Sequence, residues 1–226
     1  MKVSVYLPTY NRFESVNYAI ESFLSQDYEN KELVVYNNDT TGKMSKILKW
    51  YDDRIKIVES NNNSQLLNIN NWWNNSDADL LCQLHDDDSF TENSISSRVE
   101  CFKRNKELEV LYAGVNDIEN GVITKRPALP LDIKRLVEHD YINVTSMMWR
   151  NNIKSKLMFN EDFYYQSDLV FKLQCAFDCN MQPFIHNFVM NYNIHPKQFT
   201  TIGKPLMEYE NKMLMNFLKK KYNYES

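Results

Sequence analysis

The stretch that decides the fold is "VSVYLPTYNRFESVNYAIESFLSQDYENKELVV", residues 3–35. An apolar run rich in β-branched residues, Lys2 to Leu7, opens it and is typical of a buried strand. A second strand-like run, Glu32 to Tyr36, closes it. Between the two runs, apolar side chains recur at helical spacing at Val16, Ala19, Ile20, Phe23 and Leu24. The order predicts a strand–helix–strand unit.

The same alternation continues to about residue 100. A helical segment with Ile47, Leu48 and Tyr51 precedes the strand-like run "RIKIVES" at 54–60. A helix around Leu66 to Trp73 and a strand from Leu80 to Leu84 follow. Strands alternating with helices favour an α/β fold, with a mostly parallel central sheet flanked by helices on both faces. Ligands of such sheets bind beyond the carboxyl ends of the strands, so the loops 8–12, 37–41 and 85–89 are expected to meet at one edge.

The pattern loosens after residue 100. Asn120-Gly121 predicts a tight hairpin turn, because these residues accept the positive φ values that it needs. Strands are expected at 144–150 and 183–195, and helices at 167–177 and 206–222. Internal repeats and low-complexity linkers are absent from the sequence, which favours one continuous domain over residues 1–226. The formal net charge of −4 gives no general attraction to nucleic acid, so no nucleic-acid partner is expected.

Three consecutive aspartates, Asp86, Asp87 and Asp88, follow the strand expected at Leu80 to Leu84. Carboxylates clustered at a strand end suit Mg²⁺ or Mn²⁺. Because substrate phosphates usually complete a magnesium shell, the loop points to a phosphate-bearing substrate. The alternative is that Asp88 or Ser89 caps the helix that follows and the acidic residues complement its dipole.

Four segments together resemble the family-two glycosyltransferases of the GT-A fold, which transfer sugars from nucleotide diphosphate donors. They are residues 3–35, "LHDDDSFTEN" at 84–93, "SDLVFKLQCA" at 167–176 and "YNIHPKQFT" at 192–200, in the family's order. The second segment has Glu92-Asn93 where the family usually has Pro-Asn. The resemblance implies a GT-A-like domain, with a nucleotide-sugar-binding half at 1–100 and an acceptor-binding half at 101–226.

The resemblance also implies a metal site and a donor site. Asp87 would be the main ligand of Mn²⁺ or Mg²⁺, supported by Asp88, and His195 would approach the metal or the diphosphate. His85 stands where many members have a further acid and could equally be an ordinary hydrogen-bonding residue of the loop. The donor-binding residues would be Pro8, Thr9, Tyr10, Asn11, Arg12, Asn37, Asn38, Asp39, Asn71, Asp86 and Asp87.

The donor site has two further features. Asn37 and Asn38 depart from the aspartates common in the family, yet an amide can donate and accept, so a UDP-sugar remains the default donor. Trp72 and Trp73 are expected to be core residues rather than platforms for a sugar.

Asp168 is the candidate general base, because an inverting transfer needs a carboxylate to take the proton of the attacking hydroxyl. Another register would put Gln166 at this position, and Glu161 and Asp162 lie close upstream. Asp168 or Ser167 could instead only cap the helix.

The sequence therefore predicts a metal-dependent, inverting transfer of a sugar to a hydroxyl of a glycan, a lipid-linked or another acceptor. One alternative is a sugar-1-phosphate nucleotidyltransferase, which typically carries a glycine-rich loop where this chain has "LPTYNR". The other alternative is a degenerate protein that binds a nucleotide sugar without turnover.

The last helix combines apolar residues with Lys219 to Lys221. It is expected to close the domain with its lysine end in solvent; the alternative is peripheral contact with an anionic membrane. The expected location is the cytoplasm, or the inner face of a membrane if that alternative holds.

Overall fold

A computed structural model describes residues 1–39, 41–43, 52–60, 64–196 and 204–225. The helix expected at Ile47 to Tyr51 lies outside these residues. The strands are β1 (Val3–Thr9), β2 (Lys31–Asn37), β3 (Ile55–Glu59), β4 (Leu80–Gln83), β5 (Ser89–Phe90), β6 (Val110–Glu119), β7 (Val122–Arg126), β8 (Met148–Arg150) and β9 (Met181–Ile194). The helices are α1 (Ser15–Leu24), α3 (Gln65–Asn75), α4 (Ser94–Arg104), α5 (Ile133–His139), α6 (Ser167–Asp178) and α8 (Lys204–Tyr222), with 3-10 turns η2 (Val144–Ser146) and η3 (Asn151–Ser155).

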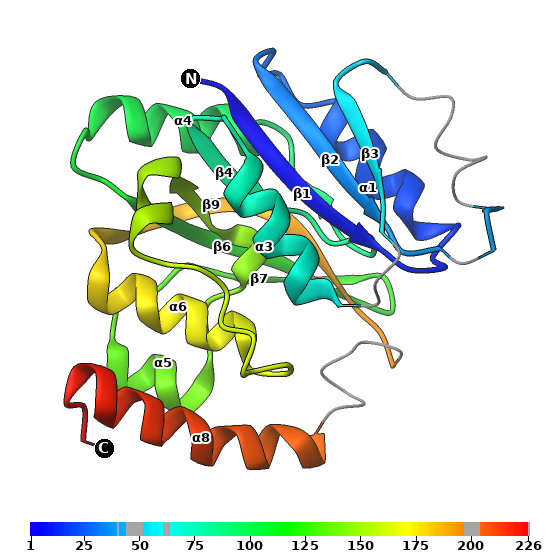
Figure 1. Cartoon of the computed structure of the whole chain (residues 1–226). Coiled ribbons are helices and arrows are strands. Elements are labelled where there is room, and N and C mark those ends of the chain that lie inside the picture. Colours follow the sequence, from blue (N-terminus) through cyan, green and yellow to red (C-terminus); the bar gives the residue numbers. More distant parts are fainter. Residues whose placement is uncertain (40, 44–51, 61–63, 197–203, 226) are drawn as a thin grey trace.

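The strands form one mixed sheet in the order β3-β2-β1-β4-β8-β6-β9-β5, and β7 pairs with β6. The strands of the first half, β3, β2, β1 and β4, are parallel, which confirms the expectation from their alternation with helices. The antiparallel strand β8 joins β4 to β6, so the second half extends the same sheet. The central sheet thus spans both halves of the chain (Figure 1).

Helices cover both faces of this sheet, as the sequence predicts. On one face α1 and α4 contribute Phe23 and Phe102 to a buried cluster. On the other face α3 and α6 contribute Trp73 and Phe171, and α8 runs below them with α5 (Figure 1). Trp72 and Trp73 are 3% and 0% exposed, which confirms that they are core residues.

The C-terminal helix α8 uses its apolar side inside the molecule. Leu214 and Leu218 are 2% and 0% exposed and belong to the same cluster as Trp73 and Phe171. This packing fits a helix that closes the domain, with Lys219 to Lys221 exposed at its end. Among the helices that the structure describes, none is both long and apolar enough to cross a bilayer.

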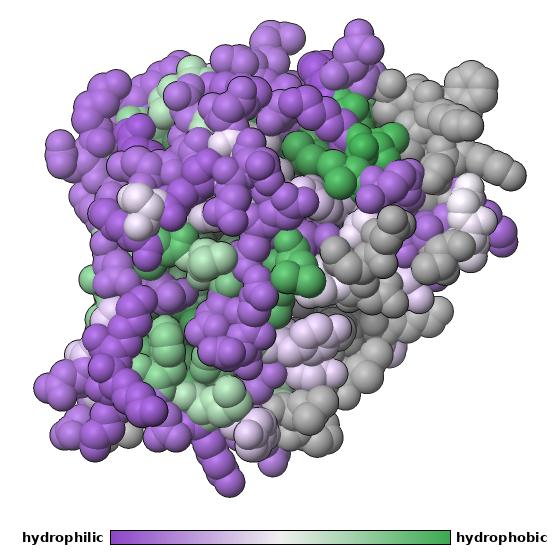
Figure 2. Space-filling model, in the orientation of Figure 1, coloured by the Kyte–Doolittle hydropathy of each residue, from purple (hydrophilic) through white to green (hydrophobic). Residues whose placement is uncertain are grey.

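Polar side chains dominate the face shown in Figure 2, and the apolar residues on it fall in separate patches.

The hairpin expected at Asn120-Gly121 and the strand expected at 144–150 differ in outcome. The hairpin is confirmed, because Asn120 and Gly121 have φ of 50° and 81° between β6 and β7. The strand expected at 144–150 is confirmed only from Met148, since the Asn143 side chain accepts from the Thr145 amide and sets up the turn η2.

The interpretation of the aspartates as a helix cap is wrong. Helix α4 begins only at Ser94, after Asn93 at φ 58°. Ser89 and Phe90 instead form β5, which pairs with Asn191 and Met190 of β9. The acidic loop is therefore held between the end of β4 and a strand of the second half.

Candidate active site

The loops that follow β1, β2 and β4 open into a cavity of about 660 Å³. Its first wall comes from the N-terminal half and includes Tyr10, Arg12, Asn38, His85, Asp86 and Asp87. Residues of the second half, among them Arg126, Tyr165, Asp168 and Tyr192, form the facing wall. The two halves of the sheet therefore share one cavity at the edge that the parallel topology predicts.

Arg12 joins the loop after β1 to the acidic loop. Its Nη1 lies 3.3 Å from Asp86 Oδ1 and also donates to Asp87 Oδ2. Asp86 is 7% exposed, and this burial raises its pKa to about 6, although Arg12 acts in the opposite direction. The Arg12 guanidinium thus stabilises carboxylates that would otherwise repel one another.

Asp87 is bound from both halves of the chain. His195 Nε2, at the end of β9, lies 3.0 Å from Asp87 Oδ2, and Asn193 Nδ2 donates to the Asp87 carbonyl at 2.6 Å. Burial acts to raise the pKa of Asp87, but the nearby His85, Arg12 and His195 outweigh it, so that its pKa is lowered. Asp87 is therefore held ionised.

Asp88 and His85 complete a group of potential metal ligands. Asp88 Oδ1 accepts from the Asn193 amide at 3.0 Å, and burial raises the Asp88 pKa to about 7. Within the described part of the chain, the buried atoms Asp88 Oδ2 and His85 Nε2 have no hydrogen-bond partner. Ligand atoms of His85, Asp87 and Asp88 lie within 4.8 Å of one another. A divalent cation would satisfy both unpaired atoms, so these residues fit a metal site.

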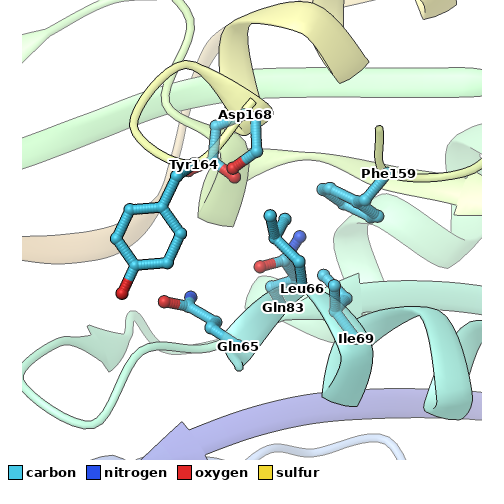
Figure 3. A pocket seen from close by; sticks show the side chains of 8 residues that line it. Gln65, Leu66, Ile69, Gln83, Phe159, Tyr164 and Asp168 are labelled. Atoms are coloured by element: carbon cyan, nitrogen blue, oxygen red, sulfur yellow. The ribbon is translucent and has the colours of Figure 1, made fainter. Parts of the chain in front are cut away.

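Asp168 lies across the cavity, in the first turn of α6. It also lines a small pocket of about 20 Å³ whose other walls include Gln65, Gln83 and Tyr164 (Figure 3). Burial raises the pKa of Asp168, while Lys172 and His85 act to lower it. A raised pKa suits a carboxylate that must accept a proton.

The other candidates for the base are placed differently. The Gln166 side chain donates to Asn211 Oδ1 at 2.6 Å, and Gln166 is not among the residues that line the cavity. Glu161 and Asp162 are exposed and are not among the residues that line the cavity. The residue before the first turn of α6 is Gln166, so Asp168 is not its N-cap. The geometry thus favours Asp168 among the alternatives.

The expected donor-binding residues fall into two groups. Pro8, Thr9, Tyr10, Arg12 and Asn38 line the cavity together with Asp86 and Asp87. Asn11, Asn37, Asp39 and Asn71 are not brought to its wall.

Asn37 and Asp39 of the second group have partners elsewhere. Asn37 Nδ2 donates to Glu59 Oε2 at 2.8 Å. Asp39 Oδ1 accepts from the amide and hydroxyl of Thr41.

Asn71 was expected to bind the donor, but the structure places it away from the cavity. Its side chain is on the exposed face of α3, where it accepts from Asn75 Nδ2 at 2.6 Å. The neighbour that reaches the donor loop is Asn68, whose Nδ2 donates to Asn38 Oδ1 at 3.1 Å. Asn68 is 3% exposed and Asn71 is exposed, so the packing of α3 brings Asn68 and not Asn71 to the loop.

Several cavity residues were not found from the sequence. They are Gln65 on α3 and, in the second half, Arg126, Tyr164, Tyr165, Lys172 and Tyr192. No motif marks these positions, and only the fold brings them to the wall that faces the acidic loop. The sequence alone does not distinguish the two roles of His85, and its place beside Asp87 and Asp88 makes it a candidate ligand.

Comparison with known proteins identifies the family. The sequence profile described as "Glycosyl transferase family 2" matches residues 4–174, which include the acidic loop and Asp168. The chain belongs to glycosyl transferase family 2. This confirms the resemblance found in the sequence and favours a sugar transferase over a nucleotidyltransferase.

Relatives with curated descriptions agree with this membership. The uncharacterized glycosyltransferase RP339 of Rickettsia prowazekii is 27% identical over 233 residues, which cover 96% of this chain and 72% of the relative. The Escherichia coli protein described as UDP-Glc:alpha-D-GlcNAc-diphosphoundecaprenol beta-1,3-glucosyltransferase WfgD is 22% identical, covering 79% and 75%. The putative glycosyltransferase EpsE of Bacillus subtilis is 28% identical over 119 residues, but the match covers only 43% of that protein.

Solved structures show that the fold is that of GT-A glycosyltransferases. The S. aureus protein TarS 1-349 in complex with UDP-GlcNAc has a TM-score of 0.78 at 16% identity, with 100% of this chain and 68% of that chain covered. The mannosyltransferase PcManGT from Pyrobaculum calidifontis, in complex with GDP-Man and Mn²⁺, has a TM-score of 0.70 at 11% identity, with 100% and 65% covered. At these identities the likeness concerns the fold alone.

Proposed function

We propose that this family 2 member is a metal-dependent, inverting transferase that moves a sugar from a nucleoside diphosphate sugar to an acceptor hydroxyl. The observation that carries the proposal is that Asp168 from the second half and Asp86 and Asp87 from the acidic loop line one cavity. One wall offers cation and diphosphate binding, and the other offers a carboxylate that can accept a proton. An inverting transfer needs these two functions on opposite sides of the reacting carbon.

The metal would be held by Asp87 and Asp88, with His85 and His195 as the imidazole candidates. Carboxylates suit both Mg²⁺ and Mn²⁺, whereas an imidazole nitrogen favours Mn²⁺, because Mg²⁺ takes oxygen ligands. When bound, such a cation would neutralise the charge that develops on a leaving diphosphate. The unpaired buried atoms of Asp88 and His85 support this assignment.

The chain's own residues would bind the donor around this loop. Arg12 lies beside Asp86 and Asp87, where its guanidinium could pair with a phosphate in the bidentate manner typical of arginine. Asp86 would accept from the donor ribose. Asn38 lines the cavity after β2 and can both donate to and accept from a base. UDP is the favoured nucleotide, which the UDP-sugar named for WfgD and the UDP-GlcNAc in TarS support.

Asp168 would act as the general base toward the acceptor hydroxyl. It would accept the hydroxyl proton as the oxygen attacks the anomeric carbon on the side opposite the diphosphate. A positioned base of this kind contributes about 10²–10⁴-fold to a rate. The acceptor would enter along the wall of the second half, where Tyr164, Tyr165 and Tyr192 line the cavity.

The proposal is tested by the thermal stability of the full chain against nucleotides and nucleotide sugars, with and without Mn²⁺. A ligand that binds only the native state raises its apparent stability. We expect a shift with one UDP-sugar that needs Mn²⁺ and is lost in Asp87→Ala. The control is Asp77→Ala, whose carboxylate lies on the surface and pairs with Lys2.

Two outcomes would count against the proposal. A shift that does not depend on metal or on Asp87 would contradict the metal site. A metal-dependent shift without release of nucleotide for any donor would favour the alternative of a binding protein without turnover.

A further inference from the structure

The C-terminal helix α8 contacts the segment that leads into α6. Glu210 of α8 is 7% exposed, and its carboxylate accepts from three consecutive backbone amides. Oε1 accepts from the Tyr164 amide at 2.9 Å. Oε2 accepts from Tyr165 at 2.9 Å and from Gln166 at 2.7 Å. One buried side chain thus binds the whole turn before α6.

This turn carries residues of the cavity. Tyr164 and Tyr165 line it directly, and Ser167 and Asp168 line it from the first turn of α6. In Figure 3 Tyr164 and Asp168 extend toward the small pocket from this same segment. Any change in the path of the backbone at 164–166 therefore displaces the candidate base and two aromatic residues together.

Glu210 supplies acceptors for amides that precede the helix. Tyr164 and Tyr165 lie before α6, Gln166 is its N-cap residue, and α6 has no N-cap side-chain bond of its own. A carboxylate suits this place, because charged acceptors make stronger hydrogen bonds and the helix N-terminus carries partial positive charge. The neighbouring Asn211 accepts from the Gln166 side chain at 2.6 Å, which fixes the same turn a second time.

The rest of α8 anchors Glu210. Phe217 packs edge-on against Phe163, with ring centroids 5.9 Å apart. At the C-terminal end of α6, Tyr222 stacks on Phe177 with ring centroids 4.2 Å apart and donates to Asp178 at 2.6 Å. Since α8 contacts α6 near both of its ends, Glu210 is held in place by packing that does not involve the cavity.

We infer that Glu210 is a positioning residue that holds the turn 164–166, and through it Asp168, in the geometry that transfer requires. This inference rests on the proposed function for its catalytic consequence, but not for the contact itself. Glu210 lies outside residues 4–174, the part of the chain that matches the family profile.

The test compares Glu210→Ala and Glu210→Gln in the full chain with the control Glu208→Ala, whose side chain is exposed on the same helix. Amide hydrogen exchange is measured for peptides that cover 163–168 and, as a reference, β4. We expect exchange at 163–168 to rise at least about tenfold in Glu210→Ala, because three amides lose their acceptor, with β4 and the control unchanged. Glu210→Gln keeps one carbonyl oxygen and should give an intermediate rise.

The same variants are then assayed for UDP release from the donor that the stability panel selects, and for the Kd of that donor with Mn²⁺. We expect turnover per folded molecule to fall at least about tenfold in Glu210→Ala, since small displacements of reacting groups are costly. The donor Kd should stay within about threefold, because the acidic loop lies on the other wall, and Glu210→Gln should recover part of the turnover.

The outcomes separate this inference from the proposed function. Unchanged exchange at 163–168 in both Glu210 variants would overturn the inference, as would normal turnover with a loosened turn. If Glu210→Ala fails to fold, Glu210→Gln decides on the same criteria. If the wild-type chain releases no nucleotide from any donor, the proposed function has failed, and the exchange data alone then decide whether Glu210 holds the turn.

Discussion

His195 Nε2 and Asp87 Oδ2 lie 3.0 Å apart, although 108 residues separate them in the chain. Asp87 follows β4 of the first half, whereas His195 follows β9 of the second half, which pairs with β6 and with the short strand β5 that follows the acidic loop. The contact therefore forms only when both halves of the sheet are complete. It links the candidate metal site to a residue beyond the part of the chain that matches the family profile.

Substitution of His195 tests whether this contact serves the metal. We expect His195→Ala to weaken Mn²⁺ binding by about tenfold or more, whether the imidazole binds the ion or orients Asp87. Loss of a residue that orients a metal ligand typically lowers metal affinity by about 10–100-fold. Isothermal titration calorimetry measures the change directly. His139→Ala is the matched control, since its side chain is 69% exposed on α5. Equal Mn²⁺ affinities for the three proteins would remove His195 from the site.

Arg12 should affect the metal and the donor in opposite directions. Its guanidinium pairs with Asp86 and Asp87 and therefore competes with a metal ion for the same two carboxylates. We expect Arg12→Ala to bind Mn²⁺ alone more tightly. With saturating Mn²⁺, the UDP-sugar should bind about tenfold more weakly, because a hydrogen bond to a charged group contributes ~1.5–3 kcal/mol.

Both affinities can be measured by calorimetry on the same preparation. Arg54→Ala is the control, because Arg54 pairs with Asp52 on the surface. Changes of the same sign for metal and donor would contradict the assignment of Arg12 to the diphosphate.

Gly114 lies where the register of β6 against β9 shifts, and two backbone carbonyls approach it closely. A Cβ at this position would lie 2.9 Å from the Arg126 carbonyl oxygen and 3.0 Å from that of Asn187. Both atoms are backbone, so Gly114→Ala should cost ~1–3 kcal/mol through overpacking and lower the Tm by about 2–12 °C.

Gly121→Ala gives the comparison for this prediction. Gly121 has φ of 81° at the open hairpin tip, where a Cβ meets nothing within 4 Å. Only its backbone conformation opposes alanine, at a cost of about 1 kcal/mol. Calorimetry measures the Tm of both variants. A larger loss of Tm in Gly121→Ala than in Gly114→Ala would show that the two carbonyls do not prevent a side chain at position 114.

The first half of the fold was predictable because its signals are local. Helical spacing between Val16 and Leu24 and the alternation of strands and helices follow from which side chains face the sheet. The parallel sheet then places the strand-end loops at one edge, which brings Arg12 to Asp86 and Asp87 without further information. Asp168 was found by its resemblance to a family motif, not by any local pattern.

The rest of the site depends on tertiary contacts that leave no local signal. Ser89 and Phe90 become a strand only because β9 lies beside them. Asn71 differs from Asn68 by three positions in an Asn-rich helix, and the packing of α3 decides which of them faces the donor loop. Glu210 resembles any other glutamate of an amphipathic helix, and only the docking of α8 on α6 reveals its partners.

The pKa of Asp168 predicts the acid limb of the activity profile. Burial raises this pKa, Asp140 adds to the shift, and Lys172 and His85 oppose it. A general base works only when ionised, so turnover should fall as pH decreases through a value above the ordinary aspartate pKa of about 3.9. Removal of the positive charge in Lys172→Met should move the limb to higher pH. A kcat profile with its acid limb at or below pH 4 would contradict the assignment.

Asp168 should also reduce the stability of the protein at neutral pH. Its pKa is higher in the folded chain than in the unfolded chain, so between the two values the folded state binds more protons, and stability falls as pH rises. Above the folded pKa the full cost of a buried carboxylate is present. Asp168→Asn removes that charge, and we expect its Tm at pH 7 to exceed that of the wild type by about 2 °C.

The gain in Tm should shrink as the pH falls through the raised pKa of the folded carboxyl, while turnover falls at least about 10²-fold at every pH. Asp162→Asn, exposed just upstream, should change neither property. Differential scanning calorimetry at pH 4 and pH 7, combined with UDP release, measures both effects. A lower Tm for Asp168→Asn at pH 7 would mean that the Asp168 carboxylate stabilises the fold. Higher stability with lost turnover is the result expected of a carboxylate that serves catalysis.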